Sequence, residues 1–257
     1  KELQLTDEEF QRFDKVSRNL FVPFQDDGII SQFEGYERLE EFDWKGYREK
    51  YDDIQRLDRI LEAENDTPNR YKASKQADVL MLFYLFSSEE LTAIFSQLGY
   101  DFKAEQIPEN IEYYYSITSH GSTLSRVIHS WVYARSDRNR SWTYYIRALK
   151  LDLEDEQGGT TAEGIHLGAM ASTVDMAMRS YSGMEIRGDV LWFNPRLPEE
   201  VKAISFILRY RGHRIVLHIS HKKISLKFMK CRANPVKVNI RGKEFTFRTN
   251  DEEEIDI

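Results

Sequence analysis

Residues 119–125 (SHGSTLS) lead from a loop rich in glycine and hydroxyl groups directly into an amphipathic helical pattern. A second stretch of the same kind, residues 158–166 (GGTTAEGIH), lies further along the chain, and residues 75–78 (KQAD) form a third polar element upstream. The first turn of a helix leaves backbone N–H groups without partners and carries partial positive charge, so such a junction can bind an anion. Together the three stretches predict a phosphate site assembled from several helix ends.

The same loops also have an ordinary structural interpretation. Ser and Thr are preferred helix N-caps, and glycine is common in turns between helices. Capping without a ligand therefore stays open for each loop taken alone. His129 and His213 fit structural or surface positions better than ligand positions, whereas His166 stands in the first turn of a helix behind a glycine-rich loop.

The spacing of apolar residues predicts a helical region followed by a β region. Helical patterns cover residues 6–19, 47–63, 75–86, 87–99, 123–134, 141–151 and 164–181. Runs of β-branched and aromatic residues predict strands at 190–193, 205–210, 213–219, 224–228, 236–240 and 244–247. Arg211-Gly212 and Arg241-Gly242 fall where hairpin turns are expected. We therefore expect two domains: residues 1–184, mainly helical, and residues 185–257, an antiparallel jelly roll or sandwich.

Composition limits the class of protein. The 257 residues are 41% hydrophobic, enough to form a packed core, and their formal net charge of −7 argues against general binding to nucleic acid or to an anionic membrane. The acidic run at 251–254 is expected to be a solvated tail. No apolar run has the length of a membrane span, no signal peptide is visible, and the single Cys231 excludes an internal disulfide. These features fit a cytoplasmic protein.

The beginning of the sequence is unusual. It starts at Lys1 rather than at a methionine, and Thr6 with Glu9 has the spacing of a capping box at the start of a helix. We therefore expect a fragment of a longer polypeptide or a processed start.

Four motifs occur in one order: residues 75–79 (KQADV), 118–125 (TSHGSTLS), 159–171 (GTTAEGIHLGAMA) and 191–195 (LWFNP). In this order they resemble glycoside hydrolase family 65, the inverting phosphorylases of α-glucosyl disaccharides such as maltose, trehalose and kojibiose. The resemblance implies an (α/α)6 barrel followed by a C-terminal β jelly roll, and this chain has room for about half of the barrel. It implies the missing N-terminal half of the enzyme as a partner, and a homodimer, because relatives are often dimers.

The resemblance also assigns roles to residues. Ser122, Thr123 and His166 would bind inorganic phosphate, which serves as co-substrate, and Lys75 and Gln76 would contact the glucosyl unit of an α-linked disaccharide. Beyond phosphate no cofactor is expected. No metal is expected either, because the sequence has no cluster of His, Asp and Glu at ligand spacing.

The general acid of the family would be a glutamate upstream of Lys1. Two carboxylates within the chain are lesser candidates. Glu34 reads more simply as a loop carboxylate, and Glu163 lies in a first helical turn, where the helix dipole favours a negative charge. If either activates water, the chain would belong to a hydrolase instead of a phosphorylase. A non-catalytic carbohydrate-binding fragment is the third alternative.

Overall fold

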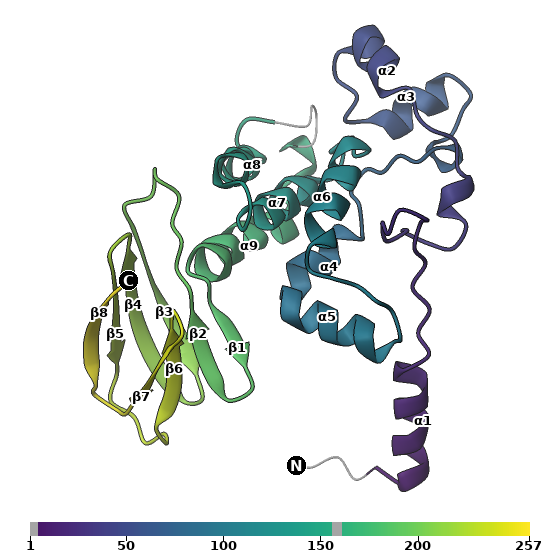
Figure 1. Ribbon diagram of the computed structural model, residues 1–257. Helices are drawn as coiled ribbons and strands as arrows, with labels where there is room; N and C mark the ends of the chain where they lie inside the picture. The colour runs from purple at the N-terminus through teal and green to yellow at the C-terminus, as the bar shows by residue number, and fades with distance from the viewer. Residues whose placement is uncertain (1–4, 156–160) are drawn as a thin grey trace. The chain divides into compact units, whose positions relative to one another are not determined.

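The computed structural model describes residues 5–155 and 161–257, apart from the side chain of Glu163. The chain divides into two compact units, Lys1–Val132 and Tyr133–Ile257 (Figure 1). The first is helical, and the second contains further helices followed by strands. Among the helices of the described residues, none combines the length and the apolar composition needed to cross a bilayer.

The first unit is made of short helices joined by long connections. Two of its helices, the first and the fifth, begin with a capping box, at Thr6 and at Ser87. The helices are α1 Asp7–Ser17, α2 Trp44–Tyr51, α3 Leu57–Ala63, α4 Leu80–Leu85, α5 Ser88–Gln97, α6 Gln106–Ser116 and α7 Thr123–Tyr133, with 3-10 turns η1 Tyr36–Arg38 and η2 Pro68–Arg70.

Two helices of this unit differ from the prediction. The single helix expected over residues 47–63 is broken, because Asp52 adopts a positive φ of 59°, which a helix cannot accommodate. Asp53 then accepts a hydrogen bond from the backbone N–H of Gln55 at 2.8 Å. Aspartate side chains often make such local bonds to the backbone, and these bonds compete with helix formation. The helix expected from residue 75 begins only at Leu80. In both places the chain forms a polar loop where the sequence predicts helix.

The second unit contains α8 Arg138–Lys150, the 3-10 turn η3 Thr161–Glu163, α9 Leu167–Asp175 and a π-helical turn, η4 Met176–Tyr181. Helices α8 and α9 pack against each other. The strands that follow are β1 Glu185–Arg187, β2 Val190–Phe193, β3 Ala203–Tyr210, β4 His213–Ser220, β5 Lys223–Phe228, β6 Val236–Ile240, β7 Lys243–Phe247 and β8 Glu252–Asp256.

The strands form two four-stranded sheets, ordered β1-β2-β6-β7 and β3-β4-β5-β8. Phe228 on β5 stacks on Phe247 on β7 with ring centroids 4.7 Å apart, so the sheets face each other as a sandwich. The predicted alternation in β4 is confirmed, since Ile215, Leu217 and Ile219 are fully buried. Both predicted hairpin turns are also confirmed: Arg211-Gly212 and Arg241-Gly242 have positive φ angles throughout, as a two-residue turn requires.

Two features of the sandwich depart from the prediction. The acidic run at 251–254 is not a solvated tail, because residues 252–256 form β8, which pairs with β5. Lys223 bonds to Glu254, and Lys227 bonds to Glu252 at 2.6 Å, so lysines opposite offset the repulsion among the carboxylates. In addition, β2 and β6 pair in parallel, whereas an antiparallel domain was expected. Between these two strands the chain forms β3, β4 and β5 of the other sheet.

Candidate active site

A short parallel bridge between Ser74 and Thr118 joins two of the predicted polar elements. Ser74 donates its N–H to the carbonyl of Ile117 at 2.9 Å, and Ser119 donates to the carbonyl of Ser74 at 2.8 Å. The loop that carries Lys75 and Gln76 therefore lies beside the loop that leads into α7. Residues 44 positions apart in the sequence are thus held in one place.

Ser122 connects the two loops through its side chain. Its Oγ donates to Oε1 of Gln76 at 2.8 Å and accepts the backbone N–H of Leu124 at 3.3 Å. The second bond is helix capping, so part of the ordinary interpretation holds for this loop. Thr123 is the first residue of α7, and among the described residues its hydroxyl has no hydrogen-bond partner. A polar side-chain amide, a hydroxyl and a helix start therefore meet at one point.

Lys75 supplies a cation next to this point. Its Nζ lies 3.5 Å from Oδ2 of Asp58 on α3, and its side chain is about half exposed. Burial raises the pKa of Asp58, but the charge of Lys75, the N–H of Arg59 and the charge of Arg56 together hold that pKa below its ordinary value. Asp58 is therefore ionised at neutral pH and keeps Lys75 close to the loop.

Gly121 explains why the loop can lie where it does. A Cβ at this position would stand 2.1 Å from the carbonyl oxygen of Gln55 and 3.0 Å from Cγ of Lys75, so only glycine fits. The positive φ of the loop, 58°, belongs instead to His120. The glycine therefore serves close packing of two backbones rather than a left-handed turn.

Gln55 and Arg126 support the loop, and the motif search missed both. Arg126, one turn into α7 and only 2% exposed, donates to Oε1 of Gln55 at 2.8 Å. The backbone carbonyl of Gln55 accepts the hydroxyl of Ser119 at 3.4 Å. Gln55 lies in the break between α2 and α3, and its sequence surroundings give no local signal of such a role.

The histidines of this region differ in exposure. His129 is fully buried, and its Nδ1 donates to the carbonyl of Ser125 at 2.8 Å, as the structural interpretation predicts. His120 is partly exposed, and its Nδ1 lies 2.9 Å from the hydroxyl of Ser125. The rings of the two histidines lie 4.6 Å apart. Ser125 thus connects the partly exposed histidine of the loop to the buried face of α7.

His166 belongs to the second unit, where it precedes α9. Its Nδ1 donates to Oδ1 of Asp152 at 2.6 Å, and its backbone N–H donates to Oδ2 at 2.9 Å. Burial raises the pKa of Asp152, but the side-chain and backbone bonds to His166 together lower it below its ordinary value. Because the carboxylate fixes Nδ1 as a donor, Nε2 is the nitrogen of His166 available to a ligand. Asp152 was not singled out from the sequence.

The two candidate carboxylates have different outcomes. Glu34 is exposed in the turn before η1, and the structure gives it no hydrogen-bond partner among the described residues. The side chain of Glu163 and residues 156–160, which include the first three residues of the second glycine-rich stretch, lie outside the described part of the chain. His213 is buried in β4, where its Nε2 lies 2.8 Å from the carbonyl oxygen of Asn234.

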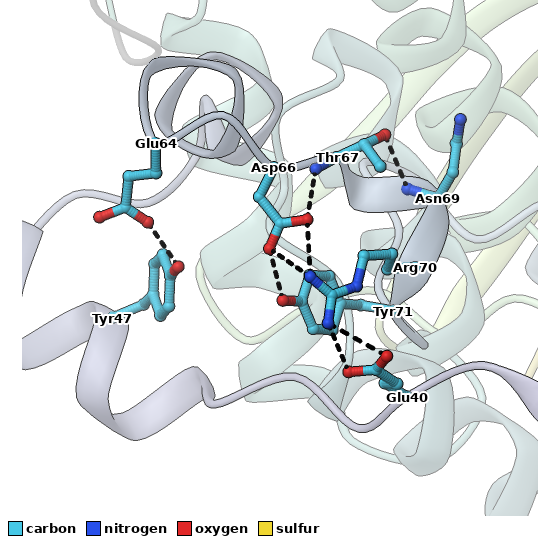
Figure 2. A network of polar contacts seen from close by, with 8 residues as sticks. All are labelled: Glu40, Tyr47, Glu64, Asp66, Thr67, Asn69, Arg70 and Tyr71. Carbon is cyan, nitrogen blue, oxygen red and sulfur yellow. Dashed lines mark hydrogen bonds and ion pairs between the residues drawn. The ribbon is translucent and has the colours of Figure 1, made fainter.

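A polar network lies at the turn that follows α3 (Figure 2). Arg70 lies between two carboxylates and donates to Glu40 at 2.9 Å and to Asp66 at 3.2 Å. Asp66 also accepts the hydroxyl of Tyr71 at 2.6 Å, and this bond, with that of the Thr67 N–H, lowers the pKa of Asp66. The network joins Glu40 to the turn after α3.

Glu64 forms a second cluster at the end of α3. It accepts a hydrogen bond from Lys50 and from the hydroxyls of Tyr47 and Tyr51, both at 2.5 Å. These bonds lower the pKa of Glu64 to about 2, and the same contact raises the pKa of Tyr47 to about 12. Helices α2 and α3 are thereby joined on either side of the break that contains Gln55.

Comparison with protein families gives two matches. Residues 1–175 match the glycosyl hydrolase family 65 central catalytic domain, and residues 184–247 match the family 65 C-terminal domain. An uncharacterized glycosyl hydrolase of Mycobacterium tuberculosis is 51% identical over 240 residues, which are 93% of this chain and 18% of that protein. Trehalose 6-phosphate phosphorylase of Lactococcus lactis is 33% identical over 88% of this chain and 30% of its own length.

The fold comparison agrees with these matches. A solved human-microbiome structure named after kojibiose phosphorylase superimposes with a TM-score of 0.71 at 22% identity. The alignment covers 98% of this chain and 34% of that protein. This chain therefore spans about a fifth to a third of the length of these relatives.

Proposed function

Because this chain belongs to glycoside hydrolase family 65, we propose that it is the part of an inverting α-glucosyl disaccharide phosphorylase that carries the phosphate site and part of the glucosyl site. Two kinds of relative support a phosphorylase: one is named trehalose 6-phosphate phosphorylase and another is named after kojibiose phosphorylase. In this proposal residues 1–184 are about half of the catalytic barrel and residues 185–257 are the sandwich that follows in the sequence.

The observation that carries the proposal is the contact between Ser122 and Gln76 at the start of α7. It joins a hydroxyl, an amide and helix-start N–H groups, with the cation of Lys75 on the neighbouring loop. Groups of these kinds stabilise an anion at a helix start through direct hydrogen bonds and the helix dipole. Ser122 and Thr123 would bind phosphate, and Lys75 and Gln76 would bind sugar hydroxyls beside it.

The chemistry requires few groups from this chain. Phosphate attacks the anomeric carbon from the face opposite the glycosidic oxygen, the carbon–oxygen bond breaks, and a carboxylic acid protonates the departing oxygen. Phosphate is already an anion, so no general base is needed, and the protein must only orient it. His166, oriented by Asp152, would add a donor to phosphate, and the general acid would come from a region preceding this segment.

A hydrolase is the second candidate, since the relative that is 51% identical is named a glycosyl hydrolase. Water would then need a general base, and Glu163 or Glu34 would have to supply it. The two candidates differ in one observable property, the dependence of turnover on phosphate.

The test is incubation of this chain with maltose, trehalose, kojibiose, nigerose and trehalose 6-phosphate, with and without phosphate. We expect phosphate binding, measured by calorimetry, without turnover by the isolated chain. Formation of β-glucose 1-phosphate would place a general acid within the chain and make Glu34 the first residue to mutate. Release of glucose without phosphate would favour the hydrolase. A chain that neither binds phosphate nor releases product would contradict the proposal.

A further inference from the structure

Three arginines from distant parts of the sequence meet at the connection between β2 and β3. Arg138 on α8 donates to the carbonyl of Arg196 in this connection, and Arg241, in the turn after β6, donates to the carbonyl of Pro195 at 3.3 Å. All of them belong to the second compact unit. We call Arg138, Arg196 and Arg241 the arginine cluster.

The connection that carries the cluster is held in place by the end of η4. The backbone N–H of Asn194 donates to the carbonyl of Gly183 at 3.1 Å, and the N–H of Arg196 donates to the carbonyl of Tyr181 at 2.9 Å. A Cβ at Gly183 would stand 2.2 Å from the carbonyl oxygen of Asn194, so only glycine permits this approach. The backbone beneath the cluster is therefore fixed before any ligand arrives.

The positive charges of the cluster are not balanced by carboxylates. Within the described residues none of its three guanidinium groups forms an ion pair. Other arginines of the same unit do form them: Arg187 pairs with Glu185, and Arg211 pairs with Asp189. The cluster is thus a local excess of positive charge in a chain whose formal net charge is −7.

Arg138 shows the strain of this arrangement most directly, because its side chain is partly buried. Burial and the charge of Arg196 lower the pKa of Arg138, and the interaction with Tyr181 opposes this only in part. The preceding Asp137 caps α8 by accepting the N–H of Arg140 at 3.0 Å. A guanidinium stays charged at neutral pH, so an anion beside Arg138 and Arg196 would relieve their repulsion.

The chemistry of the cluster favours one class of anion. A guanidinium holds its N–H donors in a planar fork that matches two oxygens of one phosphoryl or carboxyl group. A phosphoryl group carries about −1.5 to −2 charges at neutral pH, whereas a carboxylate carries a single one. A phosphoryl group can therefore offset two neighbouring guanidinium groups at once.

We propose that the arginine cluster binds a phosphoryl group, either as inorganic phosphate or as part of a small phosphate ester. The site shares no residue with the loop before α7. The inference therefore does not rest on the proposed reaction.

The test follows hydrogen exchange of this chain in inorganic phosphate, in glucose 6-phosphate and in acetate, at one pH and one ionic strength. Residues 136–142 and 194–198 report on the arginine cluster, and residues 120–126 report on the loop before α7. We expect about tenfold slower exchange around the cluster when a phosphoryl ligand is present at about ten times its dissociation constant. Protection by both phosphoryl ligands would identify the bare group as sufficient, and protection by glucose 6-phosphate alone would identify an ester.

Arg196→Gln tests the cluster with little risk to the fold, because the side chain is exposed and forms no hydrogen bond within the described residues. We expect the ligand concentration that gives half of the protection to rise at least about tenfold. Arg196→Lys keeps the charge and loses the fork, so it should recover part of the affinity. Arg209→Gln is the matched control, since Arg209 on β3 is also exposed and, in the same described part of the chain, has no ion pair.

Four results would contradict the proposal. Unchanged exchange around the cluster in both phosphoryl ligands would mean that it binds neither of them. Equal protection by acetate would mean that the cluster does not select a phosphoryl group, and an equal loss in Arg209→Gln would reveal a general effect of charge. Protection confined to residues 120–126 would leave only the site before α7. Failure of that other site would appear separately, as unchanged exchange of residues 120–126 while the cluster is protected.

Discussion

The two helix starts with candidate phosphate ligands are supported in different ways. The loop before α7 is held by residues distant in sequence: Ser122 bonds to a residue 46 positions away, and Ser119 to one 64 positions away. His166 before α9 is held by Asp152, only 14 positions away. Similar sequences, rich in glycine and hydroxyls, thus acquire a tertiary support in one case and a local one in the other.

The difference teaches what such a motif can and cannot predict. The pattern of capping residues and apolar spacing predicts where a helix starts, because those preferences act within one turn. It carries no information about which side chain holds the loop from outside. Each of the following substitutions tests one of the two supports.

We expect the largest effect from Gly121→Ala. The new Cβ would meet a backbone carbonyl at 2.1 Å, so the loop must move away from Gln55, at a cost of about 1–3 kcal/mol in the free energy of unfolding. Gly46→Ala is the matched control, since its close contact, 2.2 Å, is with the side chain of Asp43, which can move away at the cost of the cap it gives to the N–H of Gly46, about 1 kcal/mol. Urea unfolding measures both, and an equal cost for the two variants would mean that the Gln55 contact does not hold the loop.

Asp152→Asn tests the local support. The asparagine keeps the shape of the side chain but replaces a charged acceptor for Nδ1 and the N–H of His166 by a neutral one. We expect phosphate affinity, measured by calorimetry, to fall about tenfold, which corresponds to about 1.4 kcal/mol. Glu154→Gln, two residues away in an exposed pair with Lys150, should change it little. Unchanged affinity in Asp152→Asn would remove His166 from the phosphate site.

Ser122→Ala separates capping from ligand binding. Loss of the cap should cost about 1 kcal/mol of stability, and Ser87→Ala, which removes the cap of α5, should cost a similar amount. Only Ser122→Ala should also weaken phosphate binding. If both variants bind phosphate as the unmodified chain does, the hydroxyl of Ser122 serves capping alone.

Glu64→Gln tests the segment behind Gln55 and should have the smallest effect. The folded state lowers the pKa of Glu64 to about 2, so its ionised form contributes stability above about pH 4.5, and that contribution is lost as pH falls toward 2. The stability difference between the chain and Glu64→Gln should therefore shrink on acidification over that range. Denaturant unfolding at pH 6, 4 and 3 measures it, and a difference that stays constant with pH would exclude the ionised carboxylate as its source.

Local patterns predicted much of the fold. Helix α7 begins at Thr123 as expected, and the hairpins at Arg211-Gly212 and Arg241-Gly242 follow from turn chemistry between alternating strands. The prediction failed at one local break and at one contact between strands. Asp52 and Asp53 break a helix that apolar spacing alone would continue, and the polar composition of 251–254 hid a strand whose partners are lysines on β5.

The sequence indicates the motif stretches of the candidate site. It does not indicate the residues that hold these stretches in place. Residue type indicates the stretches that carry Lys75, Gln76 and Ser122, the family resemblance suggests their roles, and a bridge between two loops brings them together. Gln55, Arg126 and Asp152 have no local signature, since a glutamine, an arginine and an aspartate occur in many loops and helices without such a role. Their contribution depends on distances of 2.6 to 3.4 Å that only the folded chain defines.

Strand β8 has a further consequence for the behaviour of the protein in solution. It is an outer strand of its sheet, and outer strands present unpaired backbone groups to which another chain can add. Glu252, Glu253 and Glu254 are all exposed there, and lysines of β5 pair with two of them, so a second copy approaching along this edge would meet charged side chains. The same residues that complete the sheet therefore protect it against aggregation, and this protection should weaken at high ionic strength.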